Sequence, residues 1–238
     1  MKMTLMQHFS ELRRRILWTM LVFVVSFCFG WIISPYIEIF LTQPLINIWD
    51  DAVLLYTGIT DGLMVRFSLA TLVALIITTP AALWHIWAYM APGLHKNERQ
   101  LVLPIFVLSP LLFIIGAAFA FYILFPFVFK FFLELNDTEF IPTLLFPAVT
   151  GYLSFSIGLL KVFGIAFQLP LVLVLLNRIG VLSKQTAVKS RRYVLICIFI
   201  AAAVLTPPDI VSQILLAVPM WLLFESGILF MRDKEHVA

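Results

Sequence analysis

Two glutamates stand out because each lies in a basic segment at the end of a long apolar run. Glu11 belongs to His8-Phe9-Ser10-Glu11-Leu12-Arg13-Arg14-Arg15, and Glu98 belongs to His95-Lys96-Asn97-Glu98-Arg99. If both segments lie on one side of a membrane, the two carboxylates form an acidic pair on a basic surface. Such a pair is suited to a cationic ligand.

Both glutamates also have a purely structural interpretation. Ser10 can cap a helix, and Glu11 and Arg15 are spaced as an i,i+4 ion pair, worth about 0.2–0.5 kcal/mol. Glu98 can be a solvated charge beside Lys96 and Arg99. The residues alone leave both interpretations open.

A second polar set recurs every seven residues, at Ser154, Lys161 and Gln168. This spacing places the three side chains on one face of a helix. A lysine inside an apolar span usually faces a bundle interior or a wet cavity. The face is either functional or a set of interhelical hydrogen bonds, and Asp209 or Asp61 is a candidate partner for Lys161.

Enzyme signatures are missing from the chain. It contains neither a glycine-rich phosphate loop nor a nucleophile elbow, and its 4 histidines do not fall at metal-ligand spacings. Cys28 and Cys197 lie in apolar runs. We therefore expect no catalysis, no cofactor and no metal.

The composition is that of an integral membrane protein. Of 238 residues, 62% are hydrophobic and 12% are charged, whereas about a quarter of the residues in soluble domains are charged. The mean hydropathy is +1.04. Apolar runs long enough to cross a bilayer as helices predict an all-α fold.

Six spans are predicted, at about 16–33, 63–90, 101–125, 151–176, 193–206 and 210–225, within a single membrane domain covering residues 1–238. They leave 13 of the 16 lysines and arginines on the side that holds both termini. By the positive-inside rule that side is cytoplasmic. This topology explains the net charge of +3 without nucleic acid.

The last two predicted spans are short, because about 15 residues cover only about 22 Å as a helix. Between them lies Thr206-Pro207-Pro208-Asp209, which turns the chain. Prolines in or near the spans predict kinked helices, which favour a concave bundle. They are Pro80, Pro104, Pro110, Pro170 and Pro219.

Several motifs together resemble the TatC family, the multi-spanning receptor subunit of the twin-arginine protein translocase. Besides the two glutamate segments, the matching motifs are Pro80 with Trp84-His85-Ile86-Trp87-Ala88-Tyr89-Met90-Ala91-Pro92-Gly93-Leu94, then Phe163-Gly164-Ile165-Ala166-Phe167-Gln168-Leu169-Pro170, and Val204-Leu205-Thr206-Pro207-Pro208-Asp209. They occur in family order over nearly the whole chain.

The resemblance implies a multi-pass receptor in the cytoplasmic membrane of a bacterium, with an organellar equivalent left open. It binds twin-arginine signal peptides of folded proteins, is driven by the proton-motive force, and works with single-span TatA-type and TatB-type subunits in an oligomeric complex. The implied peptide site is Glu11 and Glu98 with Arg13, Arg14, His95 and Lys96. Spans five and six would contact a TatB-type helix, and the face with Gln168 a TatA-type helix.

Two positions depart from the family pattern. Gln168 stands where many relatives carry glutamate, so a mechanism that needs an ionisable group there is in doubt. Asp61 replaces the usual glutamate of a Thr-Glu pair. Two alternatives remain: a small transporter or channel using Lys161, Gln168 and Asp209, and a membrane anchor without a binding site.

Overall fold

A computed structural model describes the backbone of residues 5–48, 53–90, 96–136, 147–178, 180–205 and 210–232. Within these ranges, side chains are described except at 5–8, 83, 87, 90, 96–107, 135–136 and 205. The helices are α1 (Leu5–Ile46), α2 (Asp61–Met90), α3 (Lys96–Phe119), α4 (Phe125–Asn136), α5 (Val149–Ala166), α6 (Leu169–Arg178), α7 (Lys184–Lys189), α8 (Arg191–Leu205) and α9 (Ile210–Phe230). A π-helical turn, η2 (Ala120–Leu124), joins α3 to α4.

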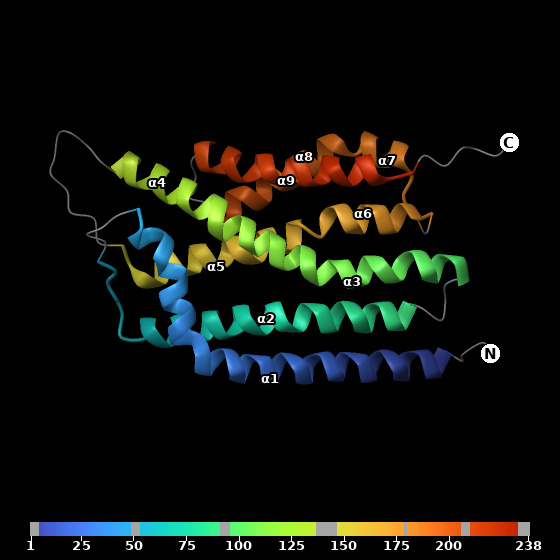
Figure 1. Cartoon of the computed structure of the whole chain (residues 1–238), viewed down its shortest axis with the longest axis horizontal. Helices are drawn as coiled ribbons and strands as arrows, with labels where there is room; N and C mark the ends of the chain where they lie inside the picture. Colours follow the sequence, from blue (N-terminus) through green and yellow to red (C-terminus); the bar gives the residue numbers. More distant parts are fainter. Residues whose placement is uncertain are drawn as a thin grey trace.

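The long helices lie roughly side by side (Figure 1). The beginning of α1, the end of α2, the beginning of α3 and the end of α9 lie at the same end of the molecule (Figure 1). We call this the basic end, because it carries Arg13, Arg14, Arg191, Arg192 and Arg232 among the described residues.

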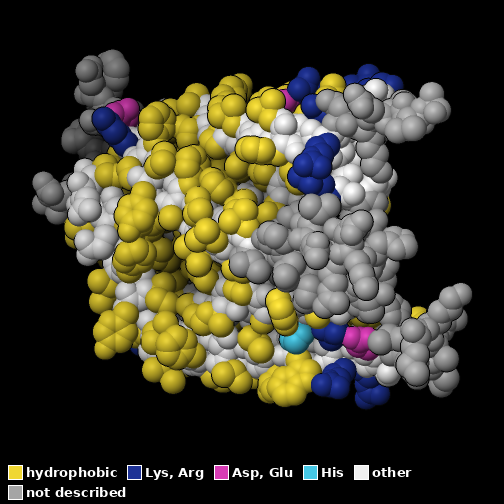
Figure 2. Space-filling view, turned by 45° about the vertical axis from the view of Figure 1, so that its right-hand side comes forward, with side chains coloured by type: hydrophobic (Ala, Val, Ile, Leu, Met, Phe, Trp, Pro, Cys, Tyr) yellow, Lys and Arg dark blue, Asp and Glu magenta, His cyan; other side chains and the backbone are white. Residues whose placement is uncertain are grey.

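The surface is apolar around its middle. In Figure 2 hydrophobic side chains form a broad band, and lysine and arginine side chains gather mainly at one end of the face shown. Among the described residues, five helical stretches are long and apolar enough to cross a membrane. The described residues are almost entirely helical and expose a broad apolar surface, as the all-α membrane fold predicted from composition requires.

Helix α1 is much longer than the predicted span 16–33, because it continues through Pro35 and Pro44 to Ile46. Pro35 lacks the N–H that would donate to the carbonyl oxygen of Trp31. The hydroxyl of Ser34 donates to that oxygen instead, at 2.9 Å. The helix therefore bends in its later half without ending (Figure 1).

The predicted span 101–125 also needs extension, since the helical path continues through η2 and α4 to Asn136. Pro126 is the second residue of α4, one residue after Phe125, and has no N–H to offer the preceding turn. A π-turn is one way in which a helix absorbs such a loss. The helical path therefore continues past the predicted limit at residue 125.

The predicted span 151–176 consists of two helices, α5 and α6, separated by Phe167 and Gln168. Here Pro170 cannot donate to the carbonyl oxygen of Ala166, the last residue of α5. This break is one of the predicted proline effects. In contrast, Pro80 and Pro219 lie inside helices that remain continuous.

The prediction of two short final spans is correct for one helix and wrong for the other. Helix α8 has 15 residues. Helix α9 has 21 residues and continues to Phe230, beyond the predicted limit at 225, and it is long enough to span a bilayer. Apolar residues following Glu225 extend it.

Close approach of backbones holds the bundle together, as expected where lipid removes the hydrophobic driving force between helices. A Cβ on Gly30 of α1 would lie 2.9 Å from the carbonyl oxygen of Ala70 of α2. Gly116 of α3 approaches the backbone of Phe163 of α5 even more closely. Both contacts require glycine, and they fix α1 on α2 and α3 on α5.

Candidate functional site

Glu11 and Arg15 form an ion pair on α1 at the basic end. Arg15 donates from Nη2 to Oε1 of Glu11 at 2.5 Å and from Nε to the same oxygen at 3.1 Å. Their side chains are 24% and 22% exposed, so the pair is partly sheltered from water. The structural interpretation of Glu11, an i,i+4 pair, is therefore present in the structure.

The same guanidinium also reaches α2. Arg15 donates from Nη2 to the carbonyl oxygen of Ala88 at 3.1 Å and from Nη1 to that of His85 at 3.5 Å. Ala88 lies in the last turn of α2, where carbonyl groups lack partners within the helix and the dipole favours a cation. Arg15 thus caps α2, and Glu11 orients Arg15.

Oε2 of Glu11 accepts no hydrogen bond from any described residue, since both donors of Arg15 use Oε1. The carboxylate borders a surface hollow of about 520 Å³ between α1 and α2. Its lining residues are Ser10, Glu11, Arg14, Arg15, Trp18 and His85. Within the described part of the chain, Oε2 is thus the carboxylate oxygen of Glu11 without a donor, and it lies beside a hollow at the protein surface.

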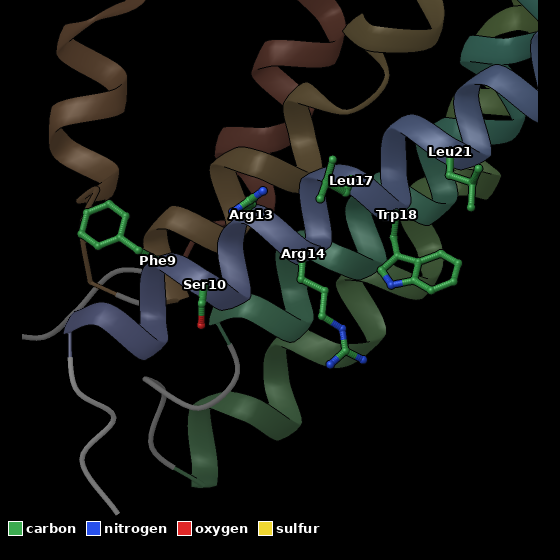
Figure 3. A pocket seen from close by; sticks show the side chains of 7 residues that line it. All are labelled: Phe9, Ser10, Arg13, Arg14, Leu17, Trp18 and Leu21. Carbon is green, nitrogen blue, oxygen red and sulfur yellow. The ribbon is translucent and has the colours of Figure 1, made fainter.

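Arg13 and Arg14 border a different hollow, of about 710 Å³, on the outer side of α1. Figure 3 shows Phe9, Arg13 and Leu17 along one side of this helix and Ser10, Arg14 and Trp18 along the other. Only Arg14, of the two arginines, also borders the hollow beside Glu11. The predicted peptide-binding set thus divides between two neighbouring surfaces.

The second predicted carboxylate lies at the start of α3. Glu98 is in the first turn of this helix, which begins at Lys96 at the basic end (Figure 1). The side chains of Lys96 and Glu98 and all of His95 lie outside the described residues. The backbone brings Glu98 to the same end of the molecule as Glu11.

Gln168 lies at the break between α5 and α6 and binds α3. Its Nε2 donates to the carbonyl oxygen of Ser109 at 2.7 Å, and the hydroxyl of Ser109 donates to its Oε1. Ser109 is fully buried. Of the two interpretations of the polar face, interhelical hydrogen bonding thus describes Gln168.

The other members of that face are separated from Gln168 by the break. Ser154 is exposed on α5, and Lys161 is half-buried on the same helix. Thr206, Pro207, Pro208 and Asp209 lie outside the described residues, between α8 and α9. The continuous stripe predicted at Ser154, Lys161 and Gln168 is wrong in its last member, because the helix does not reach residue 168.

A separate polar contact, at the opposite end of the bundle, joins α1 to the segment that follows it. The hydroxyl of Tyr56 donates to Oε1 of Glu38 at 2.6 Å. This hydrogen bond to the carboxylate raises the pKa of Tyr56 to about 12. No group of three or more histidine, cysteine or acidic residues suited to a metal occurs in the described part of the chain.

The carbonyl partners of Arg15 and the bond between Ser109 and Gln168 were not predicted from the sequence. The partners of Arg15 are 70 and 73 residues away along the chain, and those of Gln168 are 59 residues away. Such contacts depend on how helices pack. Ser109, a lone hydroxyl in an apolar run, was a signal that could have been noticed.

Comparison with known proteins places these features in one family. The family model described as "Sec-independent protein translocase protein (TatC)" matches residues 7–219. TatC of Rickettsia prowazekii (strain Madrid E) is 36% identical over 226 residues, which cover 94% of this chain and 90% of the relative. TatC of Escherichia coli (strain K12) is 37% identical over 230 residues, covering 96% and 88%.

Solved structures agree with the sequence relatives. A crystal structure of the twin-arginine translocase receptor TatC superimposes with a TM-score of 0.84 at 30% identity, covering 94% of this chain and 97% of the solved one. A second crystal structure of that receptor, in the detergent DDM, gives a TM-score of 0.86. The chain therefore belongs to the TatC family, the receptor subunits of the Sec-independent protein translocase, which are transport components and not enzymes.

Proposed function

We propose that this protein binds the twin-arginine signal peptides of folded precursor proteins, with Glu11 and Glu98 as the carboxylates that receive the two arginines. The observation that supports this most directly is the engagement of Glu11 by the guanidinium of Arg15. The surroundings of Glu11 thus already suit a guanidinium, and the hollow beside it opens to the surface.

A signal arginine would bind Oε2 of Glu11, the oxygen that Arg15 leaves open among the described contacts. Arginine would be preferred to lysine, because two N–H groups of its planar fork can converge on one oxygen, as Nη2 and Nε of Arg15 do on Oε1, while an ammonium acts as a point charge. Surrounding cations weaken the attraction of any positive ligand equally. Selectivity would therefore come from the geometry of the hydrogen bonds.

Arg13, Arg14, His95 and Lys96 would form the basic border of this site. Their charges repel the arginine pair from every position except beside a carboxylate, which restricts how the peptide lies. The position of Arg14 supports this role, because Arg14 lines the same hollow as Glu11.

The partners would be the single-span TatA-type and TatB-type subunits, with several copies of this chain in the receptor complex and the proton-motive force driving transport. A row of exposed apolar residues on α8, Ile196, Ile200 and Val204, supports a TatB-type contact on α8 and α9. Thr206, Pro207, Pro208 and Asp209 would border it. Ser154 and Lys161 would meet a TatA-type helix, with Gln168 fixing the adjacent helix break.

We further infer that the chain is a single six-span domain of the bacterial inner membrane with both termini in the cytoplasm. The excess of lysine and arginine at the basic end supports this orientation. It places Glu11 and Glu98 on the side from which precursor proteins arrive.

The test is the affinity of the purified full chain for a twin-arginine signal peptide. Replacement of Glu11 or Glu98 by glutamine should weaken binding about tenfold or more, because a hydrogen bond to a charged group contributes about 1.5–3 kcal/mol. Glu134→Gln is the matched control, since Glu134 is an exposed carboxylate on α4, paired with Lys130. Unchanged affinity in both single variants and in the double variant would refute the site.

A further inference from the structure

The outer groove of α1, lined by Phe9, Ser10, Arg13, Arg14, Leu17, Trp18 and Leu21, is not explained by peptide recognition. Every lining residue comes from α1, and the groove runs between two rows of side chains (Figure 3). Its hollow measures about 710 Å³. Among the described residues no other helix contributes to it, so we look for its occupant outside the chain.

The charges of the groove precede most of its apolar lining along α1. Phe9 and Ser10 come first, Arg13 and Arg14 follow, and Leu17, Trp18 and Leu21 continue toward the apolar middle of the helix. Seven residues from Arg14 to Leu21 correspond to about 10 Å along a helix. Leu17, Trp18 and Leu21 are 55%, 52% and 51% exposed, so half of each side chain remains uncovered.

Arg13 and Arg14 have no carboxylate partner among the described residues. None of the ion pairs found there includes either arginine. Glu11, the acidic residue close to them on α1, is engaged by Arg15. Within the described part of the chain, the groove thus presents two guanidiniums without a carboxylate partner beside an apolar surface.

We propose that this groove binds an anionic phospholipid of the surrounding leaflet. The lipid phosphate lies between Arg13 and Arg14, which can hold it through paired hydrogen bonds, and an acyl chain follows Leu17, Trp18 and Leu21. The order of charge and apolar surface along α1 matches the order of phosphate and hydrocarbon in the lipid. Trp18 lies one helical turn beyond Arg14, close to the level at which tryptophans favour the membrane interface.

The charge of the groove favours a lipid over the signal peptide. A twin-arginine segment is cationic, so Arg13 and Arg14 repel it, whereas they attract a phosphate. The lipid site goes beyond the proposed function. By neutralising both arginines, the lipid would reduce their repulsion of a peptide bound at the neighbouring Glu11.

Native mass spectrometry of the full chain, titrated with phosphatidylglycerol or phosphatidylethanolamine, tests the proposal. The unaltered chain should bind phosphatidylglycerol more tightly, and Arg13→Gln/Arg14→Gln should lower that affinity about tenfold. The matched control is Lys189→Gln/Arg192→Gln, which removes two exposed cations at the basic end. It should change the affinity by less than about twofold.

The proposal would be overturned if the unaltered chain and Arg13→Gln/Arg14→Gln bound phosphatidylglycerol with equal affinity. It would also be overturned if Lys189→Gln/Arg192→Gln lost as much affinity as Arg13→Gln/Arg14→Gln. Glu11→Gln/Glu98→Gln should retain the lipid, which separates this site from peptide binding. A second measurement needs no charge variant. The fluorescence of Trp18 is obtained as the difference between the unaltered chain and Trp18→Phe. Brominated phosphatidylglycerol should quench this fluorescence more strongly than brominated phosphatidylethanolamine does. Equal quenching by the two lipids would contradict a specific site.

Discussion

Arg15 connects the candidate site to the packing of the helices. It neutralises Glu11 and at the same time binds two carbonyl oxygens near the end of α2. One guanidinium therefore fixes both the position of the carboxylate and the distance between α1 and α2 at the basic end. An arginine bound to Glu11 within the chain also indicates how a signal arginine would bind there.

Arg15→Gln should lower the free energy of unfolding by about 1.5–3 kcal/mol, because it removes charged hydrogen bonds from a partly buried site. Arg14→Gln is the control on the adjacent position and should change stability by less than about 0.5 kcal/mol. Thermal unfolding of the detergent-solubilised chain measures both. Equal melting temperatures for the two variants would show that the cap on α2 contributes nothing.

Gln168 acts as a structural amide in this chain. Its nitrogen donates to the backbone of Ser109, a bond that an ionised glutamate at this position could not make. This bond also argues against a transport path lined by Gln168 and Lys161, because the amide is already occupied. The family membership of the chain points away from that alternative as well.

A double-mutant cycle with Ser109→Ala and Gln168→Leu should give a coupling energy of about 0.6–1.7 kcal/mol, the range for hydrogen bonds between membrane helices. Ser154→Ala replaces the same residue type at an exposed position and serves as the control. Its coupling to Gln168→Leu should be near zero. Equal coupling in the two cycles would mean that the Ser109 contact has no specific energetic role.

At the scale of the elements, glycine contacts determine how closely the helices approach. A Cβ at Gly116 would overlap the backbone oxygen of Phe163, whereas a Cβ at Gly151 would meet no atom within 4 Å. The two glycines therefore differ in what alanine would do, although both lie in membrane helices.

Gly116→Ala should destabilise the folded chain by about 1–3 kcal/mol, the usual cost of overpacking. Gly151→Ala should be neutral or stabilising by up to about 1 kcal/mol, because alanine favours the helix. The denaturation midpoint in detergent compares them. If Gly116→Ala were as stable as Gly151→Ala, the contact between α3 and α5 would be looser than described.

The sequence could predict the helices but not all of their ends. Apolar runs indicate membrane helices because composition alone decides solubility in lipid. Proline, however, has context-dependent effects. The hydroxyl of Ser34 replaces the hydrogen bond that Pro35 cannot make, so α1 continues, whereas the helix is interrupted at Gln168, just before Pro170. Similarly, the Glu11–Arg15 pair follows from i,i+4 spacing, but the carbonyl partners on α2 depend on packing between distant segments.

For the whole molecule, the orientation proposed above rests on the uneven distribution of charge. Ile59, which is fully exposed, lies in the segment before α2, and Gln185 is exposed on α7. In a background with Cys28 and Cys197 replaced by alanine, an impermeant maleimide should label Ile59→Cys in intact cells. It should label Gln185→Cys only after the membrane is opened; the reverse pattern would invert the orientation.

The proposed arginine-reading role of Glu11 and Glu98 can be tested most directly by photo-crosslinking. A benzophenone amino acid at Trp18, which lines the hollow beside Glu11, leaves both glutamates in place. The account predicts strong crosslinking to a signal peptide with Arg-Arg, weak crosslinking with Lys-Lys, and loss of that difference in Glu11→Gln/Glu98→Gln. Equal crosslinking of both peptides to the chain with intact glutamates would contradict it.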